Sequence, residues 1–177
     1  METLKTKTSK AYDHLKATSG YKNKMQAPRI MKVVISVGVG SQKDKAKVKL
    51  IEDRLSKITG QKAAARTAKV AIANFKSRQG DLVGYQVTLR GARMNDFLEK
   101  LIHISLPRTK DFRGIKREAA DDMGNYTLGI KEHTIFPETA DEELKDVFGM
   151  AITVVTTAKS KKEVVDFLEY LGFPFKK

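Results

Sequence analysis

Two segments of the chain alternate between apolar and polar side chains, and this alternation limits the folds open to it. In residues 31–39, one side carries Val33, Ile35, Val37 and Val39 and the other carries Lys32, Val34, Ser36 and Gly38. In residues 85–90, Tyr85, Val87 and Leu89 alternate with Gln86, Thr88 and Arg90. A period of two places successive side chains on opposite faces of a strand. Because antiparallel sheets can leave one face uncovered, the alternation predicts a mostly antiparallel sheet with helices packed on one face only.

Helical periodicity predicts the layer that covers this sheet. We expect amphipathic helices over residues 43–59 and 92–104, and a last helix from Ser160, where Ser160 and Glu163 form a capping box. Further strands are expected at 126–130 and 151–157, a short strand within 61–75, and an acidic turn or helix at 137–145. The mixed order of elements predicts an α+β fold in a single domain over residues 1–177, with 1–10 as a flexible basic arm.

The charge balance points to a polyanionic partner. The chain has 34 Lys+Arg against 21 Asp+Glu, a net charge of +13, so it repels itself unless it is neutralised. Nucleic acid is the commonest such partner; an anionic membrane is disfavoured because no basic amphipathic helix dominates. There are no cysteines, which excludes disulfides and thiolate metal sites. No apolar run approaches the ~18 residues of a membrane span, so a cytoplasmic location is expected.

Reaction chemistry finds little support in the sequence. The Gly38-Val39-Gly40 turn resembles the start of a dinucleotide-binding loop, but Lys43 stands where the third glycine belongs. A tight turn after a strand is the preferred interpretation. The three histidines, at positions 14, 103 and 133, lack ligand spacing and are interpreted as surface or partly packed residues. We therefore predict no enzyme, no cofactor and no metal, and keep two alternatives: a nucleotide-dependent enzyme using that turn, and a general nucleic-acid-binding module.

Cations gather instead at predicted strand ends and loops. They are Arg29, Lys32, Arg66, Lys69, Lys76, Arg78, Arg90, Arg93, Arg108, Lys110, Arg113, Lys116 and Arg117. Loops on a rigid sheet are the usual place for phosphate contacts. The loop that begins at Phe75 adds an aromatic ring to two cations. Ser36, Gln86 and Thr88 on the uncovered face are suited to the ribose 2′-hydroxyl, which RNA has and DNA lacks.

A series of motifs, in this order along nearly the whole chain, resembles one protein family. They are MQAPRI at 25–30, VGVG at 37–40, TGQK at 59–62, FKSRQG at 75–80, VTLRG at 87–91, PRTKDFRG at 107–114, GNYTLGI at 124–130, IFPE at 135–138, TTAK at 156–159 and FPF at 173–175. The series resembles the bacterial form of the fifth protein of the large ribosomal subunit, the 5S rRNA-binding protein of the central protuberance.

This resemblance implies a non-catalytic ribosomal protein with three kinds of contact. Carried over by motif, ribosomal RNA binding would fall on Ser36, Gln61 and Thr88, and the clustered cations Arg29, Lys32, Arg66, Arg90 and Arg93 are expected to join them. The loop at 75–84 would reach peptidyl-site tRNA through Phe75, Lys76, Ser77, Arg78 and Gln79. An intersubunit bridge to a small-subunit head protein would use Arg108, Lys110, Arg113, Glu138 and Asp141. The implied partners are 5S rRNA, 23S rRNA, peptidyl-site tRNA and other central-protuberance proteins, with no membrane and no second copy of the chain.

The sequence departs from the family pattern at one contact position. Ser36 and Val37 stand where the family usually has asparagine and methionine before G-V-G. A serine hydroxyl donates and accepts, but it is shorter and lacks the two donors of an amide. We expect the Ser36 contact to be lost or bridged by water. The N-terminal arm is assigned no role.

Overall fold

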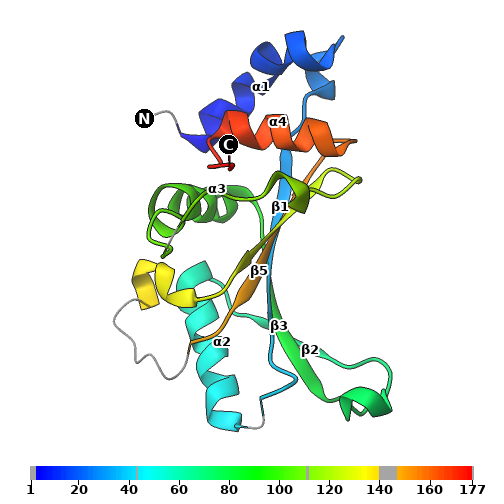
Figure 1. Cartoon of the computed structure of the whole chain (residues 1–177), viewed down its shortest axis with the longest axis vertical. Coiled ribbons are helices and arrows are strands. Elements are labelled where there is room, and N and C mark those ends of the chain that lie inside the picture. The colour runs from blue at the N-terminus through cyan, green and yellow to red at the C-terminus, as the bar shows by residue number, and fades with distance from the viewer. Residues whose placement is uncertain (1–2, 43, 111, 140–146, 177) are drawn as a thin grey trace. The chain divides into compact units, whose positions relative to one another are not determined.

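An antiparallel sheet organises the chain (Figure 1). The computed structural model describes residues 3–42, 44–110, 112–139 and 147–176. Within them, five strands lie in the order β2-β3-β1-β5-β4. These strands are β1 Ile30–Gly38, β2 Ala64–Thr67, β3 Leu82–Leu89, β4 Asn125–Ile130 and β5 Met150–Thr156. The α-helices described are α1 Leu4–Ser19, α2 Lys45–Thr59, α3 Gly91–Lys100 and α4 Lys161–Leu171. The predicted α+β class is confirmed.

The strands bury one face and leave the other accessible. Along β1, Val33, Ile35 and Val37 are buried, whereas Ser36 between them is exposed. Along β5, buried and half-buried residues alternate from Met150 to Thr156. Since successive side chains point to opposite faces, the alternation seen in the sequence corresponds to a core face and an open face.

The chain divides into two compact units, each assembled from separate stretches of sequence. The first unit comprises Met1–Val33, Leu89–Leu128 and Thr153–Lys177, and the second comprises Val34–Thr88 and Gly129–Ile152. Strands β1, β3, β4 and β5 each contribute residues to both units. The division therefore runs through strands, and the expectation of a single domain stays a prediction.

Helix α1 includes most of the residues, 1–10, over which an arm was expected. The helix begins at Leu4, capped by the Thr3 side chain, and the side chains of Leu4, Ala11 and Leu15 are buried. It packs against α4 and α3 in the first unit, as seen at the top of Figure 1. Short helices are marginal on their own, so this burial rather than local propensity accounts for α1.

The other helices begin and end largely where the sequence indicated. Helix α2 is capped by the Asp44 side chain, which accepts from the Ala46 N–H, and it ends at Gly60 with a φ of 66°. Helix α3 continues into a π-helical turn, Leu101–Ser105, before Pro107. Five apolar side chains of α3 and this turn are buried, as an amphipathic helix requires: Met94, Phe97, Leu98, Leu101 and Ile102.

The capping of α4 is confirmed in one half and differs in the other. The Ser160 hydroxyl accepts from the Glu163 N–H at 3.3 Å, as a capping box requires. The Glu163 carboxylate, however, accepts from the Lys159 N–H at 2.7 Å rather than from Ser160. Its other oxygen accepts from the Tyr21 hydroxyl. One carboxylate thus joins the start of α4 to the segment that follows α1.

Candidate nucleic-acid interface

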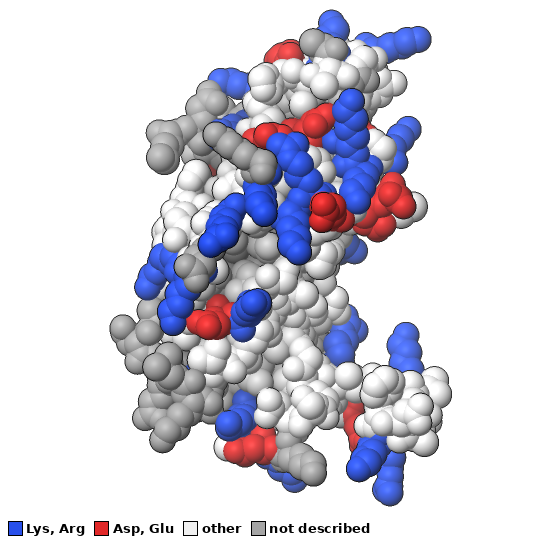
Figure 2. Space-filling model, viewed as in Figure 1, with Lys and Arg blue, Asp and Glu red and all other residues white. Residues whose placement is uncertain are grey.

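A long loop between β2 and β3 projects from the second unit. It runs over residues 68–81, so it begins seven residues before the expected start at Phe75 and ends before Gly84. Its base is fixed by hydrogen bonds from Ala68 N to Asp81 O at 2.8 Å and from Gly80 N to Ala68 O at 3.0 Å. In Figure 2 this loop forms the mostly white lobe at the lower right, with basic side chains at its edges.

The outer part of this loop is a second, smaller turn. Ile72 and Ser77 form an isolated antiparallel bridge, and the residues between them make a short 3-10 turn, Ala73–Phe75. Lys76 follows with a φ of 50°, the left-handed region that favours glycine. The Asp81 carboxylate accepts from the Arg78 N–H at 2.7 Å and closes the turn. The loop is therefore a structured hairpin extension.

The side chains on this extension combine cations with exposed apolar groups. Lys76, Arg78 and Gln79 are exposed, Ser77 is half-buried, and the Phe75 side chain is 79% exposed. Val70, at 68% exposure, and Ile72 add apolar surface that sequence reasoning missed. The alternation of apolar and polar residues in 68–72 is too short to predict that these apolar side chains are exposed. Cations with accessible apolar groups suit contact with phosphates and with sugar or base faces.

The open face of the second unit brings together part of the predicted rRNA set. Gln61, just after α2, donates from Nε2 to the main-chain oxygen of Thr88 at 3.4 Å. The Thr59 hydroxyl donates to Gln61 O at 3.0 Å and fixes the turn that carries Gln61. Ser36 lies on β1, the neighbour of β3, with its side chain exposed. Gln61 and Thr88 are thus in contact, and Ser36 shares the face of the adjacent strand.

Arg66 is tied to a residue that the predicted set omitted. Its Nε donates to Gln86 Oε1 at 2.7 Å, across the β2–β3 pairing in which Arg66 faces Gly84. Because the amide oxygen orients the guanidinium, the remaining donors of Arg66 are held over the open face. Gln86 is therefore a candidate RNA-binding residue together with Arg66. Its alternation with Tyr85 and Val87 in the sequence indicated that it lies on the open face.

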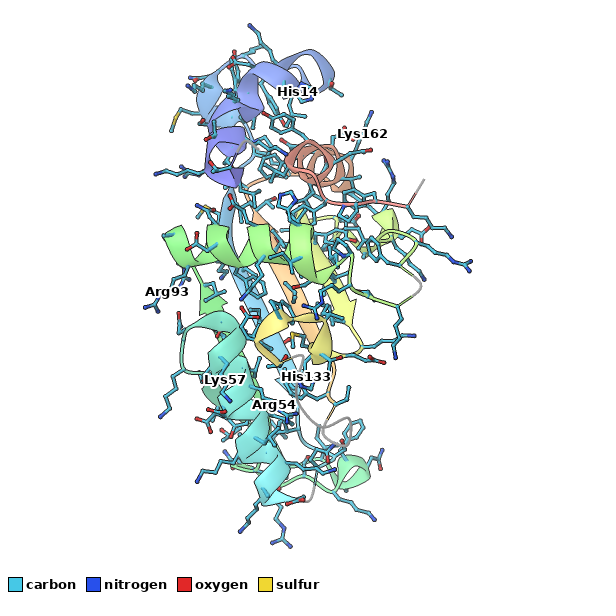
Figure 3. The ribbon with its side chains drawn as sticks, turned by 90° about the vertical axis from the view of Figure 1, so that its left-hand side faces the viewer. His14, Arg54, Lys57, Arg93, His133 and Lys162 are labelled. Carbon is cyan, nitrogen blue, oxygen red and sulfur yellow. The ribbon has the colours of Figure 1, made fainter. Side chains whose placement is uncertain are left out.

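The other four predicted rRNA residues lie in the first unit. Arg29, Arg90 and Arg93 are exposed and Lys32 is half-buried. The Arg29 N–H donates to the Thr157 hydroxyl at 3.0 Å, and Thr157 N returns a bond to Arg29 O at 3.0 Å. Arg90 immediately precedes α3 and Arg93 is in its first turn (Figure 3). The predicted set thus divides equally between the two units, and each half is a candidate in its own right.

The basic connection after α3 is held against the C-terminal tail in the first unit. Ile115 N donates to Pro174 O at 2.8 Å, and Lys176 N donates to Ile115 O at 2.9 Å. Gly114, with a φ of 95°, allows this approach, since an added Cβ would lie 2.6 Å from Lys176 N. Nearby, the Tyr126 hydroxyl donates to Lys116 O at 2.8 Å, and burial raises the pKa of Tyr126 to about 12.

The residues expected to form an intersubunit bridge are divided between the two units and a segment outside the described residues. Arg108, Lys110 and Arg113 are exposed in the first unit, and Glu138 is exposed in the second unit. Asp141 lies outside the described residues. Of the predicted acidic segment 137–145, only Pro137–Thr139 is described, as a 3-10 turn.

A buried polar cluster supports the segment that precedes Glu138. The His133 side chain is fully buried, against the expectation of a surface or partly packed histidine, and stacks on Phe148 at 4.1 Å. Its Nδ1 accepts from the Phe148 N–H at 3.3 Å, and its Nε2 lies 3.3 Å from Arg54 Nη1 on α2 (Figure 3). Burial, and then the Arg54 charge, lower the pKa of His133 to about 4.

The described residues also bear on metal binding, on membrane crossing and on the Gly38–Gly40 turn. Among the described residues, no group of three or more histidine, aspartate or glutamate side chains could hold a metal ion. None of the described helices is both long and apolar enough to cross a membrane. In the Gly38–Gly40 turn, Val39 N donates to Val83 O at 2.8 Å, so the turn is joined to β3.

Both halves of the chain match families of known proteins. Residues 23–78 match the family described as ribosomal protein L5, and residues 82–175 match the family described as the C-terminus of the same ribosomal protein. The chain belongs to the ribosomal protein L5 family. Its similarity to individual members of that family extends over nearly the full length.

Three relatives illustrate this similarity, each named large ribosomal subunit protein uL5. The protein of Natranaerobius thermophilus is 48% identical over 163 residues, covering 91% of this chain and 90% of the relative. That of Sulfurimonas denitrificans is 45% identical over 178 residues, covering 100% and 98%. That of Flavobacterium johnsoniae is 48% identical over 170 residues, covering 96% and 93%. The resemblance inferred from the motifs is confirmed.

Proposed function

We propose that this protein, a structural constituent of the large ribosomal subunit and not an enzyme, binds 5S rRNA through the open face of its sheet. Family membership supports a place on the bacterial cytoplasmic ribosome and ribosomal RNA as partner. The observation that carries the finer proposal is the contact between Gln61 and Thr88 on the face that also bears Ser36. Short polar groups on an open strand face suit the 2′-hydroxyls and base edges of RNA.

Basic residues in each of the two units are proposed to supply phosphate contacts. Arg66, oriented by Gln86, serves the second unit, while Arg29, Lys32, Arg90 and Arg93 serve the first. Phosphate contacts position an RNA without reading its sequence, whereas the polar face provides the selective contacts. The proposed partners of these two groups are 5S rRNA and 23S rRNA.

The extension at 68–81 is proposed to reach peptidyl-site tRNA. Its support is the combination of Phe75, Lys76 and Arg78 on a structured projection away from the polar face. Arg108, Lys110, Arg113, Glu138 and Asp141 are proposed to contribute to a bridge with a small-subunit head protein. Other proteins of the central protuberance complete the proposed partners.

A crosslinking map from purified ribosomes tests these assignments together. We expect 5S rRNA crosslinks at peptides containing Ser36, Gln61 and Thr88, and tRNA crosslinks at residues 68–81. Crosslinks of 5S rRNA to the extension, with none to the polar face, would reverse the assignment.

A further inference from the structure

A groove in the first unit is lined by three cations. It has a volume of about 430 Å³ and lies between α1, residues 24–30 and the start of α3. Lys5, Lys24 and Arg29 line it, together with the hydroxyl-bearing Thr8 and Ser9 and with Met25. No aspartate or glutamate is among the described residues that line it. Such a groove attracts an anion, and its size exceeds that of a single phosphate.

The wall formed by α1 is fixed in place. Leu4 is buried, and its N–H donates to the Glu99 carboxylate at 2.8 Å. Further along, Lys7 Nζ donates to Leu171 O at 3.2 Å and joins α1 to the end of α4. Because these bonds hold the turn that carries Lys5, the groove is a built feature of the first unit.

The hydroxyls in the groove are suited to accept hydrogen bonds. The Thr8 hydroxyl donates to Leu4 O at 2.8 Å, and the Ser9 hydroxyl donates to Thr6 O at 2.7 Å. With each proton used inside the helix, each hydroxyl oxygen keeps lone pairs for an incoming donor. A phosphodiester has no proton to donate, whereas a ribose 2′-hydroxyl has one. Cations beside acceptors therefore favour RNA over DNA.

Met25 supplies an apolar contact at the edge of the groove. Its side chain is 80% exposed, although its backbone is held by a capped turn. The Asn23 side chain accepts from the Met25 N–H at 3.1 Å, and Gln26 Oε1 accepts from the Lys22 N–H at 2.9 Å. A thioether held outward in this way can pack on a sugar or base face.

We propose that this groove binds the backbone of an RNA strand and forms a second RNA contact, separate from the open face of the second unit. Charge complementarity selects the occupant, and the hydroxyl acceptors select ribose. The assignment gives α1 a role in binding. It does not depend on whether the open face binds 5S rRNA.

Salt dependence of binding to an RNA duplex, compared with a DNA duplex of the same sequence, tests the groove. The double variant Lys5→Gln/Lys24→Gln should reduce the slope of log affinity against log salt by about 1.4–1.8, because each phosphate contact contributes about 0.7–0.9. The control Lys45→Gln/Lys49→Gln removes the same formal charge from exposed positions on α2 and should leave the slope nearly unchanged. An unchanged slope in the groove variant, or equal changes in both, would overturn the proposal.

The ribose preference has its own test. Thr8→Val keeps the shape of the side chain and removes the acceptor oxygen, so the ratio of RNA to DNA affinity should fall toward one. A ratio equal to that of the unmodified protein would overturn the role given to the hydroxyl.

A tethered probe locates the groove within assembled subunits. The chain has no cysteine, so Met25→Cys creates a single attachment site for an iron–EDTA reagent. Hydroxyl radicals from this position should cleave ribosomal RNA, whereas the same reagent on Lys45→Cys should give a different or empty pattern. Absence of RNA cleavage from position 25 would overturn the proposal even if the open-face variants lose 5S rRNA.

Discussion

Gln61 donates a hydrogen bond from its side-chain Nε2 to the main-chain oxygen of Thr88, 3.4 Å away. The bond joins the turn after α2 to β3 and leaves the Thr88 hydroxyl uninvolved. The Gln61 side chain therefore contributes to local structure, and the Thr88 hydroxyl is the group that we propose to contact RNA. This separation makes the open face testable by single and double truncation.

Truncation of this pair should weaken 5S rRNA binding while leaving the protein folded. We expect Gln61→Ala/Thr88→Ala to lose at most a few kcal/mol of binding free energy, because each hydrogen bond contributes about 1 kcal/mol. A filter-binding titration at fixed salt measures the change. Gln42→Ala, an exposed change in the turn before α2, is the matched control. Equal affinity of the double variant and the unmodified protein would argue against the proposed face.

Neutralising the extension should separate tRNA contact from 5S rRNA binding. Lys76→Gln/Arg78→Gln removes two cations from the extension, residues 68–81, which does not include Ser36 or Thr88. Ribosomes carrying this variant should release peptidyl-site tRNA faster, while 5S rRNA affinity stays within about two-fold. Lys45→Gln/Lys49→Gln controls for net charge. If 5S rRNA affinity and tRNA retention fall by the same factor, the extension does not separate tRNA contact from 5S rRNA binding.

His133 should make the protein less stable at mildly acidic pH. The unfolded chain takes up this proton near pH 6.5, but the folded protein does so only near 4, because burial and Arg54 lower the pKa of the ring. Between these values the unfolded state binds more protons, so the free energy of unfolding falls as pH falls from about 6.5 to 4, by about 3 kcal/mol at most. Above pH 6.5 this contribution is fully present.

Urea denaturation at several pH values between 7.5 and 4.5 measures the His133 effect. In His133→Gln the fall in stability below pH 6.5 should become shallower. If that variant does not fold, NMR titration of the His133 ring in the unmodified protein gives the pKa directly. A ring that titrates near pH 6.5 would contradict the explanation.

Gly84 should resist even the smallest substitution. A Cβ at this position would lie 2.5 Å from Val37 O, so β1 and β3 would have to separate. Gly84→Ala should destabilise the protein by about 1–3 kcal/mol, in the range of overpacked cores. Gly38→Ala is the control, since nothing lies within 4 Å of the added atom. Thermal melting compares the two, and equal melting temperatures would count against a close strand contact at Gly84.

The sequence predicts the strands and most helices well because their signals are local. The alternation of Val33, Ile35 and Val37 indicates which face of the strand the core buries. The start of α4 is predictable because Ser160, which caps it, and Glu163, whose N–H it accepts from, are near neighbours in the sequence. The sequence does not indicate the start of α1, because the buried Leu4, Ala11 and Leu15 are sparse among lysines and threonines. Its formation depends on packing against α3 and α4, which a local pattern does not report.

The candidate sites were predictable in type but less so in arrangement. Cations at strand ends signalled an anionic partner, and β-strand alternation identified Thr88 as accessible. The start of the extension at Ala68 depends on its hydrogen bonds with Asp81 and Gly80, and the burial of His133 depends on Arg54 and Phe148. These are tertiary contacts between residues of different elements or turns. Sequence spacing alone does not specify them.

Lys76 has the left-handed backbone, with a φ of 50°, that a glycine adopts without strain. For a residue with a side chain this conformation is unfavourable by about 1 kcal/mol. Lys76→Gly would relax the turn and remove the cation in the same step, so stability and the proposed tRNA contact favour different residues at this position. A search for thermostable variants would favour that change, at the expense of the cation on which the proposed contact depends.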